Sequence, residues 1–278
     1  MKLLKSHKSF AGQTQFWEHA AHSTKTNMKF SVYLPPGAIK GALIWLSGLT
    51  CNEENFISKA GAQKSLAALG LMIICPDTSP RGLDLPQERD SWEFGEAAGF
   101  YLNASTPDYC VHYRMYDYIT VEICDILLNH FGVNKNFISL MGHSMGGHGA
   151  LVIGLREASK FKSISAFAPI SNPAQGYWQK KVFCGYLGDD KQNWANYDAC
   201  ELIKNGHRHP YPILIDQGLE DVFFLEKKLM TDRFVEVATQ AGQTLDVRWR
   251  DGYDHGYYFI ATFIDSHIAF HAKALRIV

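Results

Sequence analysis

The stretch that decides the fold is Phe137-Ile138-Ser139-Leu140-Met141-Gly142-His143-Ser144-Met145-Gly146, which leads into Gly147–Glu157. Phe137–Met141 has the length and apolar character of a buried strand, and Gly147–Glu157 has helical periodicity. Between them, Gly142–Gly146 fits the G-x-S-x-G pattern of a nucleophile elbow. The glycines are needed because a side chain at either position would collide with the neighbouring strand and helix. We therefore predict that Ser144 is a nucleophile on a strained turn, at a helix N-terminus that favours developing negative charge.

The alternative role for Ser144 is that of a helix N-cap, although capping does not require glycines at these offsets. A nucleophilic serine needs two oxyanion donors, and the amide of Met145, one residue further on, is the first candidate. The second is expected after an earlier buried strand, in the loop Leu46-Ser47-Gly48-Leu49-Thr50-Cys51. Gly48 allows the Leu49 amide to turn toward the substrate oxygen. Taken alone, this loop is equally compatible with an ordinary strand-end turn.

The base and the acid are expected after Ser144 in the order acid, then histidine. His255 lies in Gly252–Gly256, a loop between the last predicted strand and the terminal helix, where a base belongs. Asp221 lies at the crest of the loop after another strand, and we select it to orient the imidazole. Glu220 and Asp216 are the reserve candidates.

Apolar runs of strand length alternate with longer segments of helical periodicity, which predicts an α/β fold. Together with the elbow, this is the α/β-hydrolase fold, a mostly parallel central sheet with helices on both faces. Strands are predicted at 14–19, 29–34, 42–46, 71–75, 137–141, 164–168, 212–215 and 245–249, the first on the second arm of a hairpin around Gly12 and the last near an edge. Helices are predicted at 60–69, 115–131, 147–157, 226–241 and 258–275. Asp77–Pro107 is a long polar loop of the kind that lines a site, and residues 1–278 are expected to form one domain.

Composition excludes several classes of function. The chain has 278 residues, 46% of them hydrophobic, and a formal net charge of −1, so it lacks a field that would attract nucleic acid. It contains no apolar run long enough to span a membrane. The basic N-terminus has no signal-peptide core, and the six cysteines are scattered, which together favour a cytoplasmic protein with reduced thiols.

A metal site is the alternative reading for the twelve histidines. His267 and His271 have H-x-x-x-H spacing, which places two side chains on one helix face. The glutamate of H-E-x-x-H is absent and no third ligand is evident, so we expect packing or exposure instead. Serine-triad chemistry requires neither a metal nor another cofactor, and we predict none.

With these residues assembled, the chain resembles the S-formylglutathione hydrolases of the esterase D family over essentially its whole length. The resemblance is carried by segments at 46–51, 80–82, 90–95, 98–101, 113–116, 142–150, 185–188 and 254–255. It implies a triad of Ser144, Asp221 and His255, with oxyanion amides at Leu49 and Met145. It places Cys51 and Trp178 beside the active site, and we assign both, with His143, to the substrate pocket. Glu96-Ala97 and Gly176–Gln179 depart from the family pattern and bear on substrate preference.

The activity implied by the resemblance is hydrolysis of S-formylglutathione to formate and glutathione, within formaldehyde detoxification. The small-molecule thioester is the only partner implied, apart from a second copy of the chain in a homodimer. The first alternative is a general short-chain carboxylesterase. An acyltransferase and a non-catalytic hydrolase-fold binding protein are further alternatives. Cys51 is expected to lie where alkylation blocks the pocket, rather than to act as a second nucleophile. For the aromatic residues at 92–101, loop packing is favoured over glutathione binding.

Overall fold

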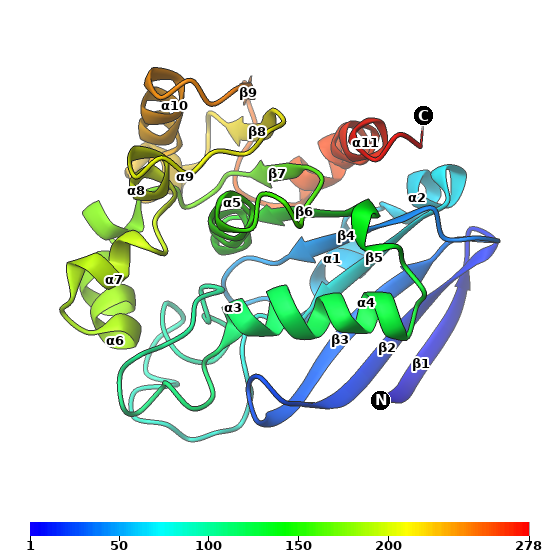
Figure 1. The fold of residues 1–278 in the computed structure, drawn as a ribbon, viewed down its shortest axis with the longest axis horizontal. Helices are drawn as coiled ribbons and strands as arrows, with labels where there is room; N and C mark the ends of the chain where they lie inside the picture. Colours follow the sequence, from blue (N-terminus) through cyan, green and yellow to red (C-terminus); the bar gives the residue numbers. More distant parts are fainter. Residues whose placement is uncertain (278) are drawn as a thin grey trace.

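The computed structural model describes residues 1–277, and within this range a nine-stranded sheet forms the centre of the molecule (Figure 1). Its order is β1-β2-β3-β5-β4-β6-β7-β8-β9. The strands are β1 (Lys2–Ser9), β2 (Gly12–Ala21), β3 (Thr26–Leu34), β4 (Gly41–Leu46), β5 (Leu71–Pro76), β6 (Ile138–His143), β7 (Ile164–Phe167), β8 (Ile213–Gly218) and β9 (Leu245–Arg250). The pairs β1–β2, β2–β3 and β3–β5 are antiparallel, and the other five pairs are parallel. The predicted mostly parallel α/β sheet is confirmed.

Burial along the sheet follows the sequence pattern. The apolar strands β4, β5, β6, β7 and β8 are buried at every residue, because helices cover both faces of the parallel part. At the edges, β1 is almost wholly exposed and β9 is mostly half-buried. The prediction that the last strand lies near an edge is therefore confirmed, and the elbow lies in the middle of the sheet, at the carboxyl end of β6.

Helices pack on both faces of the sheet (Figure 1). α5 contacts β4, β6 and β7, and α8 joins it to α10 on one face, whereas α2 and α11 contact each other on the other face. The helices are α1 (Glu53–Lys59), α2 (Gln63–Leu69), α3 (Met115–Asp117), α4 (Cys124–Asn129), α5 (Met145–Arg156), α6 (Cys184–Leu187), α7 (Lys191–Ala195), α8 (Ala199–Lys204), α9 (Val222–Leu225), α10 (Thr231–Gln240) and α11 (Tyr257–Ala274). Short π-helical or 3₁₀ segments are η1 (Tyr118–Ile123), η2 (Lys135–Phe137), η3 (Pro173–Gln175) and η4 (Gln179–Phe183).

Two predicted helices are wrong in their boundaries. The segment predicted at 60–69 is helical only from Gln63, because Gly61 takes a positive φ of 71° and separates α2 from α1. The preceding helix α1 was missed, although Asn52 begins it with a capping box. The segment predicted at 226–241 is helical only from Thr231, because Lys227 and Met230 have positive φ values of 57° and 56°. The short helices between 179 and 204 were also missed.

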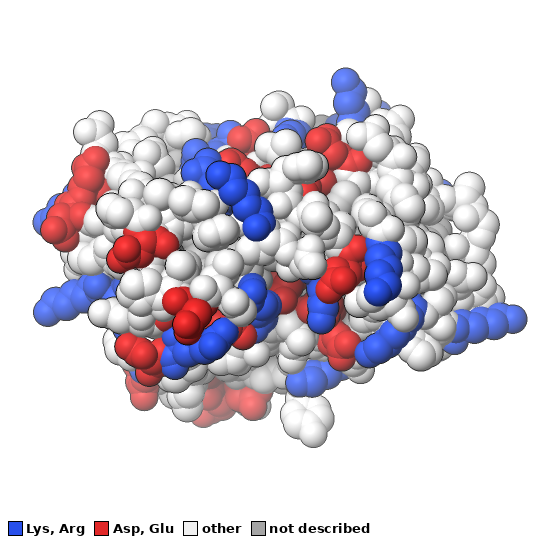
Figure 2. All heavy atoms as spheres, turned by 90° about the horizontal axis from the view of Figure 1, so that it is seen from below, with Lys and Arg blue, Asp and Glu red and all other residues white. Residues whose placement is uncertain are grey.

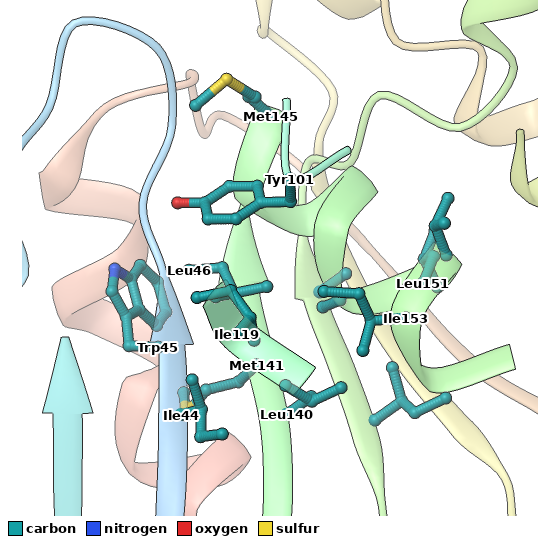
Figure 3. Packing of buried hydrophobic residues seen from close by; sticks show 14 of the residues in the cluster. Ile44, Trp45, Leu46, Tyr101, Ile119, Leu140, Met141, Met145, Leu151 and Ile153 are labelled. Carbon is teal, nitrogen blue, oxygen red and sulfur yellow. The ribbon is translucent and has the colours of Figure 1, made fainter. Parts of the chain in front are cut away.

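The hydrophobic core includes the side chains packed between α5 and the central strands (Figure 3). Ile44, Leu140 and Met141 from the sheet and Leu151 and Ile153 from α5 are all fully buried. Each such side chain stabilises the fold by about 1.5–3 kcal/mol relative to an exposed position. The elbow is therefore packed against a close-packed core, which keeps Ser144 in one position.

The surface and the helices add two observations. The face shown in Figure 2 carries interspersed Lys/Arg and Asp/Glu side chains, without an extended patch of one sign. Across residues 1–277, none of the helices combines the length and apolar character needed to cross a bilayer.

Candidate active site

The turn at Ser144 has the backbone that its flanking glycines predict. Ser144 joins β6 to α5 with φ 58° and ψ −117°, a conformation that L-residues rarely adopt. A Cβ at Gly142 would lie 2.2 Å from the Gly146 carbonyl oxygen, and one at Gly146 would lie 1.8 Å from the Leu46 carbonyl oxygen. Both distances are far inside van der Waals contact, so the helix and β4 approach this turn only because both positions are glycine.

The Ser144 hydroxyl is free for chemistry. Its side chain makes no capping hydrogen bond with α5, although the residue occupies the N-cap position. Its backbone is held on both sides, since Ser144 N donates to Phe167 O at 2.9 Å and Ser144 O accepts from His148 N at 2.9 Å. The hydroxyl is thus presented to a cavity by a fixed backbone.

His255 and Asp221 form a hydrogen-bonded pair beside this serine. The distance from His255 Nδ1 to Asp221 Oδ2 is 2.5 Å, and the Asp221 side chain is fully buried. Asp221 Oδ1 also accepts from Phe223 N at 2.9 Å, so the carboxylate is locked as the N-cap of α9. The pair assigns the ring proton to Nδ1, which leaves Nε2 as the basic nitrogen. His255 and Ser144 line the same cavity.

The reserve carboxylates are occupied elsewhere. Asp216 is fully buried in an ion pair with Arg250, at 2.9 Å from Oδ2 to Nη2. Glu220 is exposed on the loop, and its backbone N–H donates to Tyr253 O at 3.0 Å. Of the three carboxylates considered from the sequence, Asp221 is the one that contacts His255.

Leu49 lines the same cavity as Ser144, and Met145 follows Ser144 directly in the chain. Leu49 follows β4 in a loop that packs closely on the elbow. A Cβ at Gly48, in this loop, would lie 3.2 Å from Ser144 Cβ. Within residues 1–277, the Leu49 N–H donates to no protein group. Met145 is the first residue of α5, where the N–H has no partner inside the helix. Its side chain is buried next to Tyr101 (Figure 3), and its sulfur accepts from Phe100 N at 3.3 Å.

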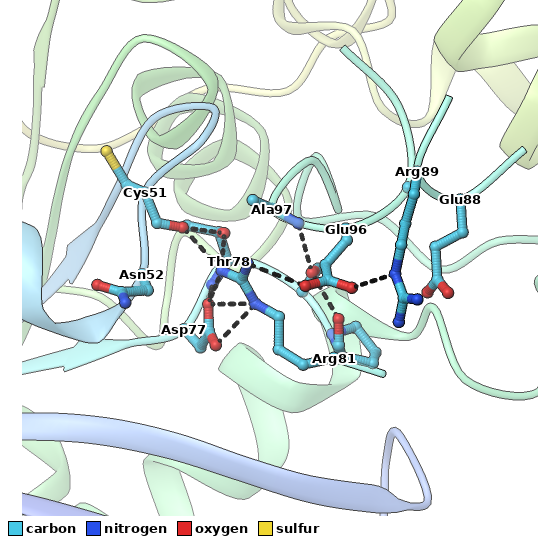
Figure 4. Close-up of polar contacts among 12 residues, drawn as sticks. Cys51, Asn52, Asp77, Thr78, Arg81, Glu88, Arg89, Glu96 and Ala97 are labelled. Carbon is cyan, nitrogen blue, oxygen red and sulfur yellow. Dashed lines mark hydrogen bonds and ion pairs between the residues drawn. The ribbon is translucent and has the colours of Figure 1, made fainter. Parts of the chain in front are cut away.

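A polar cluster holds the far end of the Leu49 loop (Figure 4). The Cys51 carbonyl oxygen accepts from Thr78 Oγ1 at 2.7 Å and from Arg81 Nη2 at 2.9 Å. Arg81 is in turn paired with Asp77, at 3.0 Å from Nε to Oδ2. Burial raises the pKa of Asp77, and the Arg81 guanidinium opposes that effect. Sequence reasoning missed the role of these residues, although Arg81 stands in one of the segments that carry the family resemblance.

Tyr101 and Ala97 hold the same loop from the long segment 77–107. Tyr101 Oη donates to Ser47 O at 2.8 Å, and Thr50 N donates to Ala97 O at 3.1 Å. Ala97 has a positive φ of 63°, a conformation that favours glycine. Glu96, the other departure, forms a salt bridge with Arg89 at 3.1 Å and lies 3.8 Å from Arg81.

The cavity at the site has a volume of about 450 Å³, within the range typical of small-molecule sites. It is lined by Gly48, Leu49, Thr50, Cys51, Asn55, Lys59, Trp92, His143, Ser144, Trp178, Phe223, Leu229, His255 and Tyr257. The Trp178 ring is buried and its Nε1 donates to Lys228 O at 2.8 Å. Trp92 meets it edge to face, with ring centroids 6.3 Å apart. These two rings make one part of the cavity wall apolar.

The aromatic residues at 92–101 divide between two roles. Phe94, Phe100 and Tyr101 are buried and pack the loop, as favoured from the sequence. Trp92 is 46% exposed and lines the cavity. The packing interpretation therefore holds for three of these four residues and fails for Trp92, which lies within reach of a ligand.

His143 and Cys51 line the cavity with different chemistry. The ring centroid of His143 lies 4.4 Å from that of His255. Burial, reinforced by the charge of His255, lowers the pKa of His143 well below its ordinary value, so this ring stays neutral. Burial also raises the pKa of the Cys51 thiol. A protonated thiol is a poor nucleophile, which favours a passive position for Cys51 at the pocket wall.

His267 and His271 lie in the core under β7 and form a buried chain with serines. His271 contacts Ser163 Oγ at 2.7 Å and Ser165 Oγ at 2.8 Å, and His267 Nδ1 contacts Ser165 Oγ at 2.9 Å. Packing therefore explains the H-x-x-x-H spacing. Over the described range 1–277, no three His, Cys, Asp or Glu side chains converge as metal ligands do.

Comparisons with known proteins agree with this geometry. The Esterase family model matches residues 21–270. An S-formylglutathione hydrolase of Rattus norvegicus is 48% identical over 279 residues, with 99% of each chain covered. One of Arabidopsis thaliana is 46% identical and covers 98% of this chain and 97% of its own. The solved structure of an S-formylglutathione hydrolase from Agrobacterium tumefaciens has a TM-score of 0.95 and 42% identity, over 99% of this chain and 100% of that one. The chain therefore belongs to the esterase family that contains the S-formylglutathione hydrolases.

Proposed function

We propose that this protein is a serine hydrolase that cleaves S-formylglutathione to formate and glutathione, with Ser144, His255 and Asp221 as its triad. The main observation in support of this chemistry is the hydrogen bond from His255 Nδ1 to the buried Asp221. His255 also lines the same cavity as Ser144. The substrate rests on relatives of that name at 46–48% identity over nearly the whole chain.

The reaction begins at the Ser144 hydroxyl. His255 Nε2 takes its proton while the oxygen attacks the formyl carbon, and Asp221 stabilises the imidazolium that forms. The carbonyl oxygen becomes an oxyanion, which the amides of Leu49 and Met145 receive. Each such donor contributes about 3 kcal/mol to transition-state stabilisation.

The tetrahedral intermediate then collapses to a formyl-enzyme on Ser144. The C–S bond breaks and the His255 imidazolium returns its proton to the departing sulfur, so glutathione leaves as a thiol and His255 is again neutral. The sulfur is a good leaving group because a free thiol has a pKa of about 8.5. Water enters, His255 removes one of its protons, and the water oxygen attacks the formyl ester. The C–O bond to Ser144 then breaks, His255 returns the proton to the Ser144 oxygen, and formate is released. The neutral His143 beside His255 adds no competing charge to this step.

The shape of the cavity supports a small acyl group. Trp178, buried and fixed by its bond to Lys228 O, stands beside Trp92 in the lining. Bulky fixed rings leave room for a formyl group and disfavour longer acyl chains, by about 1–3 kcal/mol for each additional methylene. A general short-chain carboxylesterase is the second candidate, because the same triad and oxyanion amides would also cleave a small ester.

Further proposals concern the whole protein. Residues 1–278 form one domain, which predicts a single cooperative unfolding transition by calorimetry. The protein is a homodimer on the strength of the family resemblance, and light scattering should give twice the chain mass of 31.3 kDa. The cysteines within residues 1–277 are all free thiols, which fits a reducing cytoplasm, and cell fractionation tests that location.

The experiment compares kcat/KM for S-formylglutathione with that for p-nitrophenyl acetate, in the wild type and in Ser144→Ala. A strong preference for the thioester, with a loss of about 10⁴-fold or more in the variant, supports both the nucleophile and the substrate. An ester rate equal to or above the thioester rate returns the assignment to a general esterase. Activity that survives in Ser144→Ala overturns the mechanism.

A further inference from the structure

The cavity lining contains a polar group of side chains that the triad chemistry does not use. Thr50 at the end of the oxyanion loop, and Asn55 and Lys59 on α1, all line the cavity that holds Ser144. The aromatic rings of Trp92, Trp178 and Phe223 line it as well. A cavity with one apolar and one polar set of lining groups suits a ligand that carries a small reactive end and a charged remainder.

Lys59 brings an uncompensated positive charge to this cavity. Its ammonium lies 5.4 Å from the ring centroid of Tyr257, which also lines the cavity. Among the described lining residues there is no aspartate or glutamate, and within residues 1–277 Lys59 forms no salt bridge. Its side chain is exposed at the cavity, so it is available to an anionic ligand without breaking an existing contact.

Asn55 and Lys59 are spaced i, i+4 on α1, which places them on one helix face. Asn55 Oδ1 is already engaged as the acceptor from Asn52 N at 2.8 Å, and this contact assigns the amide NH₂ to the outer position. The Thr50 hydroxyl adds a third hydrogen-bond donor nearby. Three donors, one of them charged, match the acceptor-only chemistry of a carboxylate.

We propose that Lys59, assisted by Asn55, binds a carboxylate of the glutathione moiety and thereby selects glutathione thioesters over uncharged acyl esters. This inference rests on the proposed function. Glutathione carries two carboxylates, each within about two residues of its sulfur, a reach of ~7 Å in extended form. His255, Tyr257 and Lys59 line one cavity, so the base and the ammonium belong to one continuous site.

The test measures binding separately from turnover. S-methylglutathione, which has no cleavable acyl group, is used as a competitive inhibitor of p-nitrophenyl acetate hydrolysis. The proteins are the wild type, Lys59→Met, Lys59→Arg and the control Lys64→Met, which changes an exposed lysine on α2 outside the cavity. We expect the inhibition constant to rise about 5- to 10-fold in Lys59→Met, the range expected for one charged contact at a partly exposed site. It should stay near the wild-type value in Lys59→Arg and in the control.

A second measurement uses the charge itself. In the wild type, added salt should raise the inhibition constant, and this dependence should be weaker in Lys59→Met. For substrates, the ratio of kcat/KM for S-formylglutathione to that for an uncharged N-acetylcysteamine thioester should fall about 5- to 10-fold in Lys59→Met.

The outcomes separate the two proposals. If the wild type hydrolyses S-formylglutathione but S-methylglutathione inhibits Lys59→Met and wild type equally, the carboxylate subsite is wrong and the function stands. An equal fall in kcat/KM for the charged and uncharged thioesters also overturns the subsite, because it indicates a general loss of catalysis. If the wild type does not hydrolyse S-formylglutathione, the proposed function itself fails.

Discussion

The elbow around Ser144 and the oxyanion loop Ser47–Cys51 lie against each other, and each carries one of the two amides proposed to bind the oxyanion. The elbow is held by backbone sterics, because Gly142 and Gly146 allow strand, turn and helix to touch. The loop is held by side chains from elsewhere, since Arg81 and Thr78 bind the Cys51 carbonyl and Tyr101 binds the Ser47 carbonyl.

The difference teaches how the two halves of one site depend on the rest of the chain. The elbow needs only a few adjacent residues and a place in the sheet. The loop depends on residues 27 to 54 positions further along, all within the long segment 77–107 that has no helix or named strand. Such a loop is ordered by its own buried polar contacts and aromatic packing, so damage far from Ser144 should still move the Leu49 amide.

The largest effect is expected from Gly146→Ala, which attacks the elbow. The added Cβ would lie 1.8 Å from the Leu46 carbonyl oxygen, and neither backbone can move without disturbing the sheet. We expect loss of nearly all activity and more than about 3 kcal/mol of stability, measured by urea unfolding. Gly242→Ala is the matched control, because its φ of 75° is strained but its surroundings are open, and it should cost only about 1 kcal/mol. Equal costs for the two variants would contradict the steric account.

The next effect is expected from Arg81→Met, which attacks the loop. The change removes a donor to the Cys51 carbonyl and leaves Asp77 buried without its partner, at a cost of about 3 kcal/mol. We expect kcat to fall about 10- to 100-fold with a smaller change in KM, since complete loss of an oxyanion donor costs 10²–10³-fold. Arg81→Lys keeps the charge and should restore part of kcat. A variant of lower stability with unchanged kcat would show that the cluster supports the fold alone.

A pH-dependent effect should distinguish the elbow helix from the exposed surface. Burial lowers the pKa of His148, on α5, to about 4, whereas an unfolded histidine titrates near 6.5. The unfolded chain therefore binds the proton more readily than the folded one. The contribution of neutral His148 to the free energy of unfolding is complete above about pH 6.5 and is lost as the pH falls toward 4. It amounts to at most about 3 kcal/mol. Urea unfolding of the wild type and of His148→Gln between about pH 4 and 6.5 measures this contribution, and the variant of the exposed His130, His130→Gln, is the control. Identical pH profiles of stability for all three proteins would refute the assignment to His148.

The smallest effect is expected from Cys51→Ser, within the loop. The Cys51 thiol lines the cavity while its carbonyl carries the contacts to Thr78 and Arg81, so a side-chain change leaves those contacts in place. Activity should stay within about threefold of wild type, and inhibition by thiol reagents should disappear. Rates with and without iodoacetamide provide the measurement. Loss of most activity in the serine variant would assign the thiol a direct part in the reaction.

Much of the fold follows from local pattern. The buried strands were predicted because five short apolar runs have the length and composition of strands that helices cover on both faces. The helix boundaries at 53–69 and 226–241 were less predictable. There, residues with positive φ at Gly61, Lys227 and Met230 end or delay a helix, and two of the three are not glycine.

The sequence by itself determined the elbow and the order of the candidate triad, because both depend on glycine spacing and on the strand ends nearest in the chain. Only the tertiary structure decided which carboxylate meets His255, since Asp216, Glu220 and Asp221 share one strand and its loop, and burial and capping separate them. It also decided the contacts of Arg81 with Cys51 and the place of Lys59 in the cavity. These are contacts between distant segments, and they form only when the packed sheet brings the segments together.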